Sequence, residues 1–200
     1  MIKMGSFNLR KRVKNRIKRV FFTGFLAFLS LSCKEDQLPK PSGMLALNYS
    51  SAKYSLFEPE NCPYSFQKNE AGKVQFEEDC SVIINYPKLN GALYLTYRPV
   101  ENNIKQLLSD AQKLTYEHVI KADNIIEEKY VNDTQDVYGM FYDVSGNAAS
   151  QSQFYVTDST AHFLTGSIYF NAKPNYDSIY PAADYLRKDI RHLMESLSWR

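Results

Sequence analysis

Three cysteines and three histidines are the side chains of this 200-residue chain best suited to nucleophilic, redox or metal chemistry. They are Cys33, Cys62, Cys80, His118, His162 and His192. A nucleophilic Ser or Cys needs a base within reach, and a metal-binding helix needs two suitably spaced histidines. The sequence contains no G-x-S-x-G elbow, no H-E-x-x-H helix and no glycine-rich phosphate loop. We therefore expect no enzyme activity, no metal and no cofactor, although carboxylates paired by folding would leave no sequence signature.

Cys33 directly follows a segment typical of a secretory signal. Eight Lys or Arg and no acidic residue precede an apolar run over residues 20–32, which is shorter than the about 20 residues of a bilayer-spanning helix. The segment resembles the lipobox of bacterial lipoproteins, with Ser30 where that pattern usually carries Leu. Residues 1–32 are thus predicted to be a lipoprotein signal peptide and Cys33 the lipidated residue. The alternative is a released protein, cut by an ordinary signal peptidase, with an incidental Cys33.

Lipidation of Cys33 would fix the chain to a bilayer, because each buried methylene contributes about 0.8 kcal/mol and two or more acyl chains anchor stably. Residues 33–43 are polar and contain two prolines and a glycine, so they are predicted to be an extended tether. Residues 44–200 are predicted to form a single domain. The expected location is the cell envelope, with the outer membrane favoured and either its periplasmic or its surface face open.

The charge of the chain changes sign once the signal is removed. The first 32 residues hold eight of the 24 Lys and Arg and none of the 22 Asp and Glu, so 16 basic and 22 acidic residues remain, a net charge of −6. An acidic domain of this kind is not expected to bind nucleic acid or an anionic lipid surface.

Cys62 and Cys80 are the two cysteines left in the mature chain. In an oxidising compartment an even pair favours a disulfide, which would stabilise the fold by about 3 kcal/mol. Two buried free thiols are the alternative. A metal site is disfavoured because no histidine lies near either cysteine at ligand spacing.

The hydrophobic pattern predicts an α+β fold, a mostly antiparallel sheet with two long helices packed on it. Strands are expected at residues 44–49, 54–57, 64–66, 74–76, 81–97, 125–131, 136–144, 148–157 and 162–170, and helices at 101–123 and 178–197. Asn90-Gly91 predicts a two-residue type I′ turn, and the apolar strand after it should be covered on both faces. Asp177 is expected to cap the last helix, with Pro181 in its first turn. The element order resembles the Mog1/PsbP-like sandwich.

A run of amides and hydroxyls at residues 146–158 is unusual for strands. Its polar side chains are either a recognition surface for a small ligand, such as a glycan or a lipid, or the solvent face of a sheet. The candidate surface consists of Asn147, Ser150, Gln151, Gln153 and Tyr155.

Several long runs resemble the gliding-motility lipoprotein GldD family of Bacteroidota. They are KLTYEHVIKAD at 113–123, YGMFY at 138–142, GNAASQSQFYVTDS at 146–159 and TGSIYFNAKPNYDSIYPAADYLRKDIRHLMESL at 165–197, together with CKED at 33–36 and CPYSF at 62–66. The resemblance implies a membrane-anchored accessory protein needed for gliding, in a machinery linked to type IX secretion. Its implied partners are the bilayer, through acyl chains on Cys33, and other envelope proteins of that machinery. Cys33 is the functional position that the resemblance transfers.

Overall fold

The computed structural model describes residues 49–117, 121–172 and 175–200. Ten strands in this part of the chain form two antiparallel sheets. The large sheet has the order β3-β4-β5-β9-β8-β7-β6, and the small sheet has the order β1-β2-β10. The strands are β1 Tyr54–Phe57, β2 Tyr64–Asn69, β3 Lys73–Phe76, β4 Val82–Tyr86, β5 Gly91–Pro99, β6 Ala122–Asn132, β7 Val137–Gly146, β8 Ser152–Thr157, β9 His162–Phe170 and β10 Ser198–Trp199. The predicted α+β class with a mostly antiparallel sheet is confirmed.

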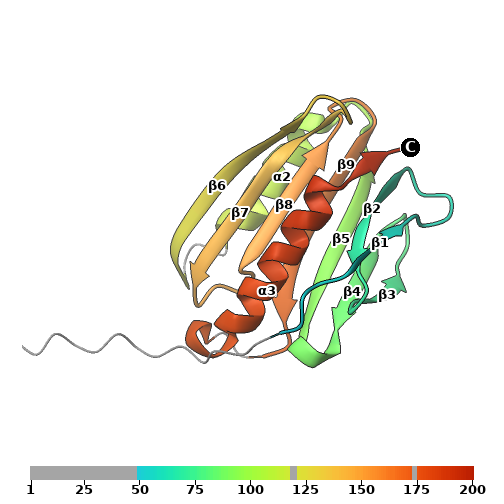
Figure 1. Cartoon of the computed structure of the whole chain (residues 1–200). Helices are drawn as coiled ribbons and strands as arrows, with labels where there is room; N and C mark the ends of the chain where they lie inside the picture. Colours follow the sequence, from blue (N-terminus) through green and yellow to red (C-terminus); the bar gives the residue numbers. More distant parts are fainter. Residues whose placement is uncertain (1–48, 118–120, 173–174) are drawn as a thin grey trace, which may run out of the picture. The chain divides into compact units, whose positions relative to one another are not determined.

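The two helices lie on opposite faces of the large sheet, as Figure 1 shows. Helix α3, Tyr176–Glu195, runs across β7, β8 and β9 and also contacts β2 of the small sheet. Helix α2, Ile104–Glu117, lies on the other face. The main core forms between the large sheet, α3 and the small sheet, and it is filled by side chains such as Phe66, Leu95 and Ile190.

The two helices are held very differently. Helix α3 buries seven side chains, among them Leu186, Ile190 and Leu193. The described part of α2 buries Thr115 alone, while Leu114 is 42% and Tyr116 49% exposed. Since buried apolar area is what stabilises a helix in a fold, α3 is integral to the core and α2 is a lightly packed cover.

The hairpin at Asn90 differs from the predicted two-residue turn. Strand β4 ends at Tyr86, a short 3-10 turn η1 follows over Pro87–Leu89, and β5 begins at Gly91. Asn90 alone takes the left-handed conformation, with φ 50°. Pro87 explains the longer loop, because it lacks the N–H that a continuing strand would need, and it starts the 3-10 turn instead.

Three further expectations are corrected. Strand β5 is not covered on both faces, since Tyr94 is 42% exposed. Helix α2 ends before the predicted residue 123, because β6 begins at Ala122. Helix α3 begins at Tyr176 after an extended Asn175, so Asp177 lies in the first turn rather than at the cap and Pro181 lies inside the helix.

Candidate functional site

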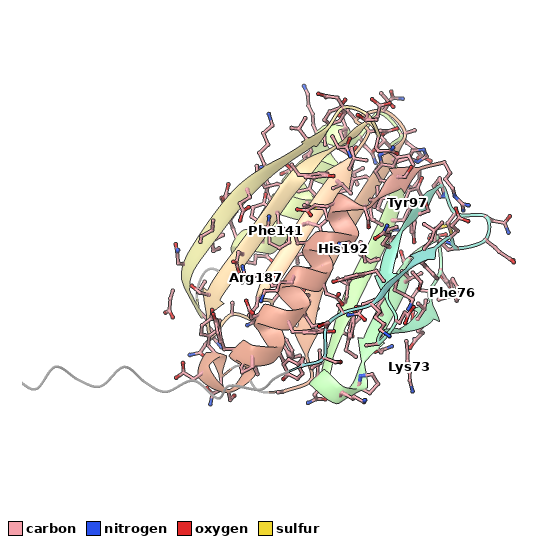
Figure 2. The ribbon with its side chains drawn as sticks, viewed as in Figure 1. Lys73, Phe76, Tyr97, Phe141, Arg187 and His192 are labelled. Atoms are coloured by element: carbon pink, nitrogen blue, oxygen red, sulfur yellow. A yellow bond between two sulfur atoms is a disulfide. The ribbon has the colours of Figure 1, made fainter. Side chains whose placement is uncertain are left out.

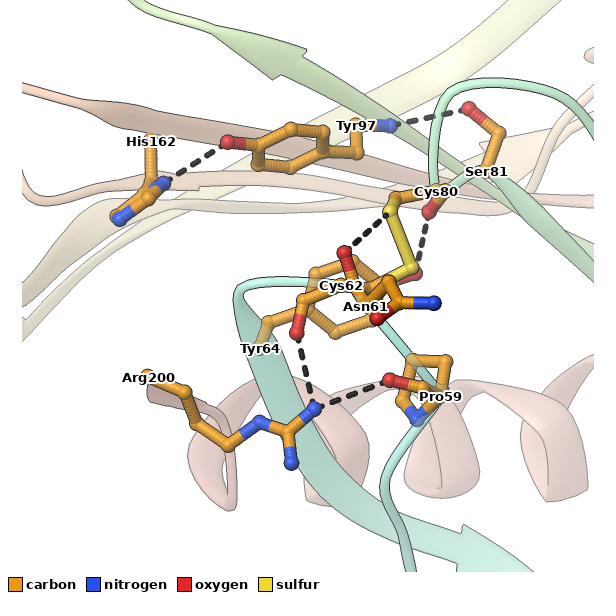
Figure 3. Close-up of a disulfide and its surroundings, with 9 residues drawn as sticks. All are labelled: Pro59, Asn61, Cys62, Tyr64, Cys80, Ser81, Tyr97, His162 and Arg200. Carbon is orange, nitrogen blue, oxygen red and sulfur yellow. Dashed lines mark hydrogen bonds between the residues drawn. A yellow bond between two sulfur atoms is a disulfide. The ribbon is translucent and has the colours of Figure 1, made fainter.

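Cys62 and Cys80 form a disulfide, with Cα atoms 5.5 Å apart. Cys62 precedes β2 and Cys80 precedes β4, so the bond ties the small sheet to the large one. Figure 3 shows the groups around it: Tyr64 donates its hydroxyl to the Cys80 carbonyl, and Arg200 donates to the carbonyls of Pro59 and Cys62 at 3.0 and 2.9 Å. Burial raises the pKa of Tyr64 to about 12, so it stays a donor at physiological pH. The disulfide and these hydrogen bonds therefore have a structural role.

The two described histidines have structural partners. The His162 Nδ1 lies 2.9 Å from the Tyr97 hydroxyl (Figure 3), and its ring stacks on Trp199 at 5.2 Å. The His192 Nε2 lies 2.8 Å from Gln67 Oε1, against the ring of Tyr54. Within the described ranges, no three His, Cys, Asp or Glu side chains are grouped so as to hold a metal ion. His118 and Cys33 lie outside the described residues.

The predicted surface at Asn147–Tyr155 is largely wrong, because its central residues are buried. Ser150 is 0%, Gln151 3% and Gln153 3% exposed. Helix α2 lies over Gln153, whose Oε1 is 3.3 Å from the Thr115 hydroxyl. Tyr155 is half-buried and stacks on Phe163, with ring centroids 5.7 Å apart. Alternation along one strand cannot reveal that a helix lies over its polar face.

Asn147 is exposed, but its side chain has a local structural role. Its Oδ1 accepts a hydrogen bond of 2.9 Å from the backbone N–H of Tyr176, the first residue of α3. This bond satisfies one of the free donors at a helix start, the role that a capping side chain normally fills. Asn147 therefore fixes the start of α3, across 29 residues of sequence.

Three buried polar atoms next to β8 have no hydrogen-bond partner among the described residues: Gln151 Oε1, Ser152 Oγ and Gln153 Nε2. Gln151 does donate from Nε2 to the Ala148 carbonyl at 2.8 Å. An unpaired buried amide costs about 1–3 kcal/mol. Ser152 shares the α3 face of β8 with Phe154, whereas Gln153 faces Thr115 of α2, so the layer beneath α2 at Gln153 is polar and only partly satisfied.

A buried carboxylate links three elements on the other side of the molecule. Asp189 of α3 is 4% exposed, and each of its oxygens lies 3.0 Å from Asn69 Nδ2 of β2. The Tyr86 hydroxyl of β4 donates to Asp189 Oδ2 at 2.6 Å. Burial, with the nearby Asp189 charge, raises the pKa of Tyr86. The sequence carried a signal of this site, since Asp189 lies three residues from Leu186 and four from Leu193, on the apolar stripe of its helix.

Charged side chains clamp the outer part of α3 to the sheet. Arg191 holds Glu128 of β6 with two hydrogen bonds of 2.8 Å, and its guanidinium lies 4.2 Å from the centre of the Phe141 ring. The hydrogen bond from Arg191 is the main cause that lowers the pKa of Glu128. Arg187 pairs with Asp143 of β7 at 3.2 Å, yet burial still raises the pKa of Asp143. These ion pairs stabilise the helix position.

The free edges of the two sheets lie together. Among the described strands, β1 pairs with β2 alone, and β3 pairs with β4 alone. The two edges meet at the rings of Phe57 and Phe76, whose centroids are 6.1 Å apart, and Figure 1 shows β1 and β3 side by side. Phe76 and Leu56 are each 65% exposed, and Figure 2 shows Phe76 at the margin of the molecule. We refer to strands β1 and β3 as the double edge.

None of the helices in the described ranges is long and apolar enough to span a bilayer.

Comparison with known proteins identifies the family. A family model described as gliding motility lipoprotein GldD matches residues 34–199. No curated protein matches the chain in a sequence search. The solution structure of the PsbP protein CyanoP from Synechocystis sp. PCC 6803 is similar to this chain, with a TM-score of 0.47 and 10% identity over 78% of this chain and 98% of that chain. The family match gives the protein a role in gliding motility as a membrane-associated lipoprotein of the cell envelope. The chain belongs to the gliding motility lipoprotein GldD family.

Proposed function

We propose that this protein is a lipid-anchored, non-catalytic accessory component of the gliding and type IX secretion machinery, and that it acts by contacting other envelope proteins. Family membership supports the gliding role. The single structural observation that carries the contact role is the double edge, where Leu56 and Phe76 are each 65% exposed. Exposed strand edges are templates for pairing with another chain, and partner strands commonly add to them.

The anchor in this proposal is Cys33, which follows a signal peptide of residues 1–32 and begins a tether of residues 33–43. Residues 44–200 are the single domain that makes the protein contacts. Tyr49, the first described residue, lies 16 positions after Cys33, and a fully extended chain of that length reaches about 55 Å. The domain can therefore contact protein partners well above the headgroups of the bilayer.

The composition of the sheet edges favours the double edge over the opposite edge. Strand β6 is the other edge of the large sheet and contains Asp123, Glu127, Glu128 and Lys129. Charged residues are a common device that blocks edge-to-edge pairing. Strand β1, with the sequence YSLF, contains no charged residue, and β3 contains a single lysine. The double edge thus lacks the protection that β6 has.

The test places a charge on each edge and follows gliding and partner capture in cells. Phe76→Glu should abolish colony spreading and remove envelope proteins from a proximity-labelling profile. Val131→Glu on β6 is the matched control, because Val131 is 48% exposed, and it should leave both readouts unchanged. Cys33→Ala should abolish spreading and release the protein from the membrane fraction.

Two results would contradict the proposal. If Phe76→Glu, with unchanged abundance, glides and labels like wild type, the double edge is not the contact surface. If the Cys33→Ala protein stays in the membrane and supports spreading, the anchor is wrong.

A further inference from the structure

A cavity of about 310 Å³ lies where the described chain enters the domain. Its wall contains the rings of Tyr49, Tyr86 and Tyr185 together with Leu89, and two lysines, Lys73 and Lys88, also line it. This volume is at the lower end of the range of small-molecule sites, which are mostly apolar with a few polar groups. The cavity shares Lys73 with the double edge, but Leu56 and Phe76, which carry the proposed contact, do not line it, and Phe76 stands at the other end of β3.

Tyr86 and Tyr185 contribute mainly ring surface because their hydroxyls already make hydrogen bonds to other residues. The Tyr86 hydroxyl donates to Asp189 at 2.6 Å, and the Tyr185 hydroxyl accepts from Asn69 Nδ2 at 3.0 Å. The Tyr49 ring meets the Tyr185 ring edge-on, with centroids 5.3 Å apart. Since the buried network fixes Tyr86 and Tyr185, the apolar wall is formed before any ligand arrives.

The two lysines are the available charges of the cavity. Neither Lys73 nor Lys88 forms a salt bridge or a side-chain hydrogen bond to another residue of the described part of the chain. Figure 2 shows Lys73 at the lower end of the view, pointing away from the sheet. The Asp189 carboxylate does not line the cavity, and its oxygens are occupied by Asn69 and Tyr86. Two ammonium groups without a protein partner in the described residues, beside apolar rings, select for an anion through local contacts, although the chain beyond residue 32 has a net negative charge.

We infer that this cavity binds an anionic amphiphile, with its apolar body against the tyrosine rings and Leu89 and its carboxylate or phosphate between Lys73 and Lys88. Two sources supply that chemistry: a soluble acid or phosphate ester with a short apolar chain, or the headgroup region of a phospholipid in the bilayer. Both are within reach, because Tyr49 lies in the cavity wall and is the described residue nearest in sequence to the anchor position at Cys33.

The test uses the full chain carrying Cys33→Ala, purified without detergent, and four probes studied by calorimetry below their micellar concentrations. Decyl phosphate and decanoate carry both parts of the proposed ligand, decanol has the apolar part alone and inorganic phosphate the charge alone. We expect the two anionic amphiphiles to bind one to one and at least tenfold more tightly than decanol or inorganic phosphate. Lys73→Gln and Lys88→Gln should each weaken decyl phosphate binding about tenfold, a difference of about 1.4 kcal/mol.

Two variants complete the design. Lys129→Gln, on the opposite edge of the same sheet, should leave the affinity unchanged, because Lys129 is exposed and lies on β6. Leu89→Trp should block binding by filling the cavity. A parallel flotation assay with phosphatidylcholine vesicles, with and without phosphatidylglycerol, separates the two sources. If the protein floats only with vesicles that contain phosphatidylglycerol, and Lys73→Gln and Lys88→Gln abolish this flotation, the ligand is a lipid of the bilayer. If the protein binds the free probes but does not float, the ligand is a soluble acid.

Three results would overturn the inference. Decanol binding as tightly as decyl phosphate would mean a purely apolar site. Equal weakening by Lys129→Gln would mean unspecific attraction to surface lysines. No binding of either anionic amphiphile, free or in vesicles, would mean that the cavity is not a ligand site. Since gliding and partner labelling are measured with other variants, each of these results is distinguishable from failure of the proposed contact role.

Discussion

The hydroxyl of Tyr86 donates a hydrogen bond of 2.6 Å to the carboxylate of Asp189, across 103 residues of sequence. This bond joins the end of β4 to the middle of α3, and Asn69 adds β2 to the same carboxylate. A buried charge is costly unless it is paired or hydrogen-bonded, so these donors make Asp189 tolerable inside the protein. The network therefore fixes where α3 lies over both sheets and holds one wall of the cavity.

Removing the carboxylate should destabilise the protein strongly. In Asp189→Ala the buried donors of Asn69 and Tyr86 lose their acceptor, and we expect the free energy of unfolding to fall by about 2–5 kcal/mol. Tyr86→Phe should cost about 1–3 kcal/mol, because one hydrogen bond to a charged group is lost. Urea denaturation measures both values.

The control for these variants is Tyr116→Phe. Tyr116 also donates to a carboxylate, that of Glu127, but at an exposed position. Its loss should change stability by less than about 0.5 kcal/mol. If Tyr86→Phe costs as little as Tyr116→Phe, the network is not a structural anchor.

Much of the fold was predictable because its pattern is local. Strand β9 begins at His162 and ends at Phe170, as alternation predicted. Along it Leu164 and Ile168 point into the main core, while Ser167 faces the other side. The 3.6-residue stripe of α3 was equally clear, since seven of its side chains are buried. Alternation and helical period report which side of an element is apolar, and that suffices where one face meets a core.

What could not be predicted depends on contacts far apart in sequence. The polar side chains of β8 look like a surface until α2 is placed over Gln153. The role of Asn147 depends on the position of Tyr176. Gly139 is needed because a Cβ there would lie 1.9 Å from the Tyr155 carbonyl oxygen of the neighbouring strand. No short window of sequence contains both partners of any of these pairs.

The disulfide gives a prediction about redox conditions. In a Cys33→Ala background, dithiothreitol should lower the melting temperature, because opening a loop of 18 residues removes about 3 kcal/mol. For a domain of this size that corresponds to about 6–12 °C. Differential scanning calorimetry measures the shift. The Cys62→Ser, Cys80→Ser double variant is the control: it should melt at the lower temperature with or without reductant, and any response to reductant would show that the loss has another origin.

The turn between β8 and β9 gives a prediction about how the stability of the protein changes at low pH. Asp158 Oδ1 accepts backbone N–H bonds from Thr160, Ala161 and His162 at 3.0, 2.9 and 2.8 Å. Burial alone would raise the pKa of Asp158, but these donors outweigh it and the pKa is lowered. A lowered folded-state pKa means that the stabilisation is complete above the unfolded-state pKa, about 3.9, and is lost as pH falls through the folded-state value.

Asp158→Asn should therefore be less stable than wild type at pH 7, by about 1 kcal/mol, since the site is only partly buried. The difference between the two proteins should shrink as the pH falls below about 4. Chemical denaturation between pH 3 and pH 7 measures it. Glu70→Gln, at an exposed position, should show no comparable difference at pH 7. If the difference in unfolding free energy between wild type and Asp158→Asn grows as the pH falls, the pKa of Asp158 is not lowered by folding.

The polar layer beneath α2 predicts a substitution that keeps or raises stability, whereas the substitutions above lower it. Gln153 is 3% exposed and its Nε2 has no partner among the described residues, while its Oε1 makes a hydrogen bond of 3.3 Å with Thr115. Gln153→Met keeps a similar shape and removes the unpaired amide. Thr115 keeps its own bond of 3.1 Å to the Ala111 carbonyl. We expect Gln153→Met to be unchanged or more stable by about 1 kcal/mol, because the cost of the unpaired donor disappears.

The matched control is Gln112→Met on the exposed side of α2, which should change stability by less than about 0.5 kcal/mol. Urea denaturation of both variants, with hydrogen exchange of the α2 amides, separates the effect on the layer from the effect on the helix. If Gln153→Met loses more than about 1 kcal/mol and α2 exchanges faster, the amide has a partner that stabilises the helix on the sheet. If Gln153→Met gains stability and the α2 amides exchange more slowly, the unpaired amide of Gln153 was weakening the contact between α2 and the sheet.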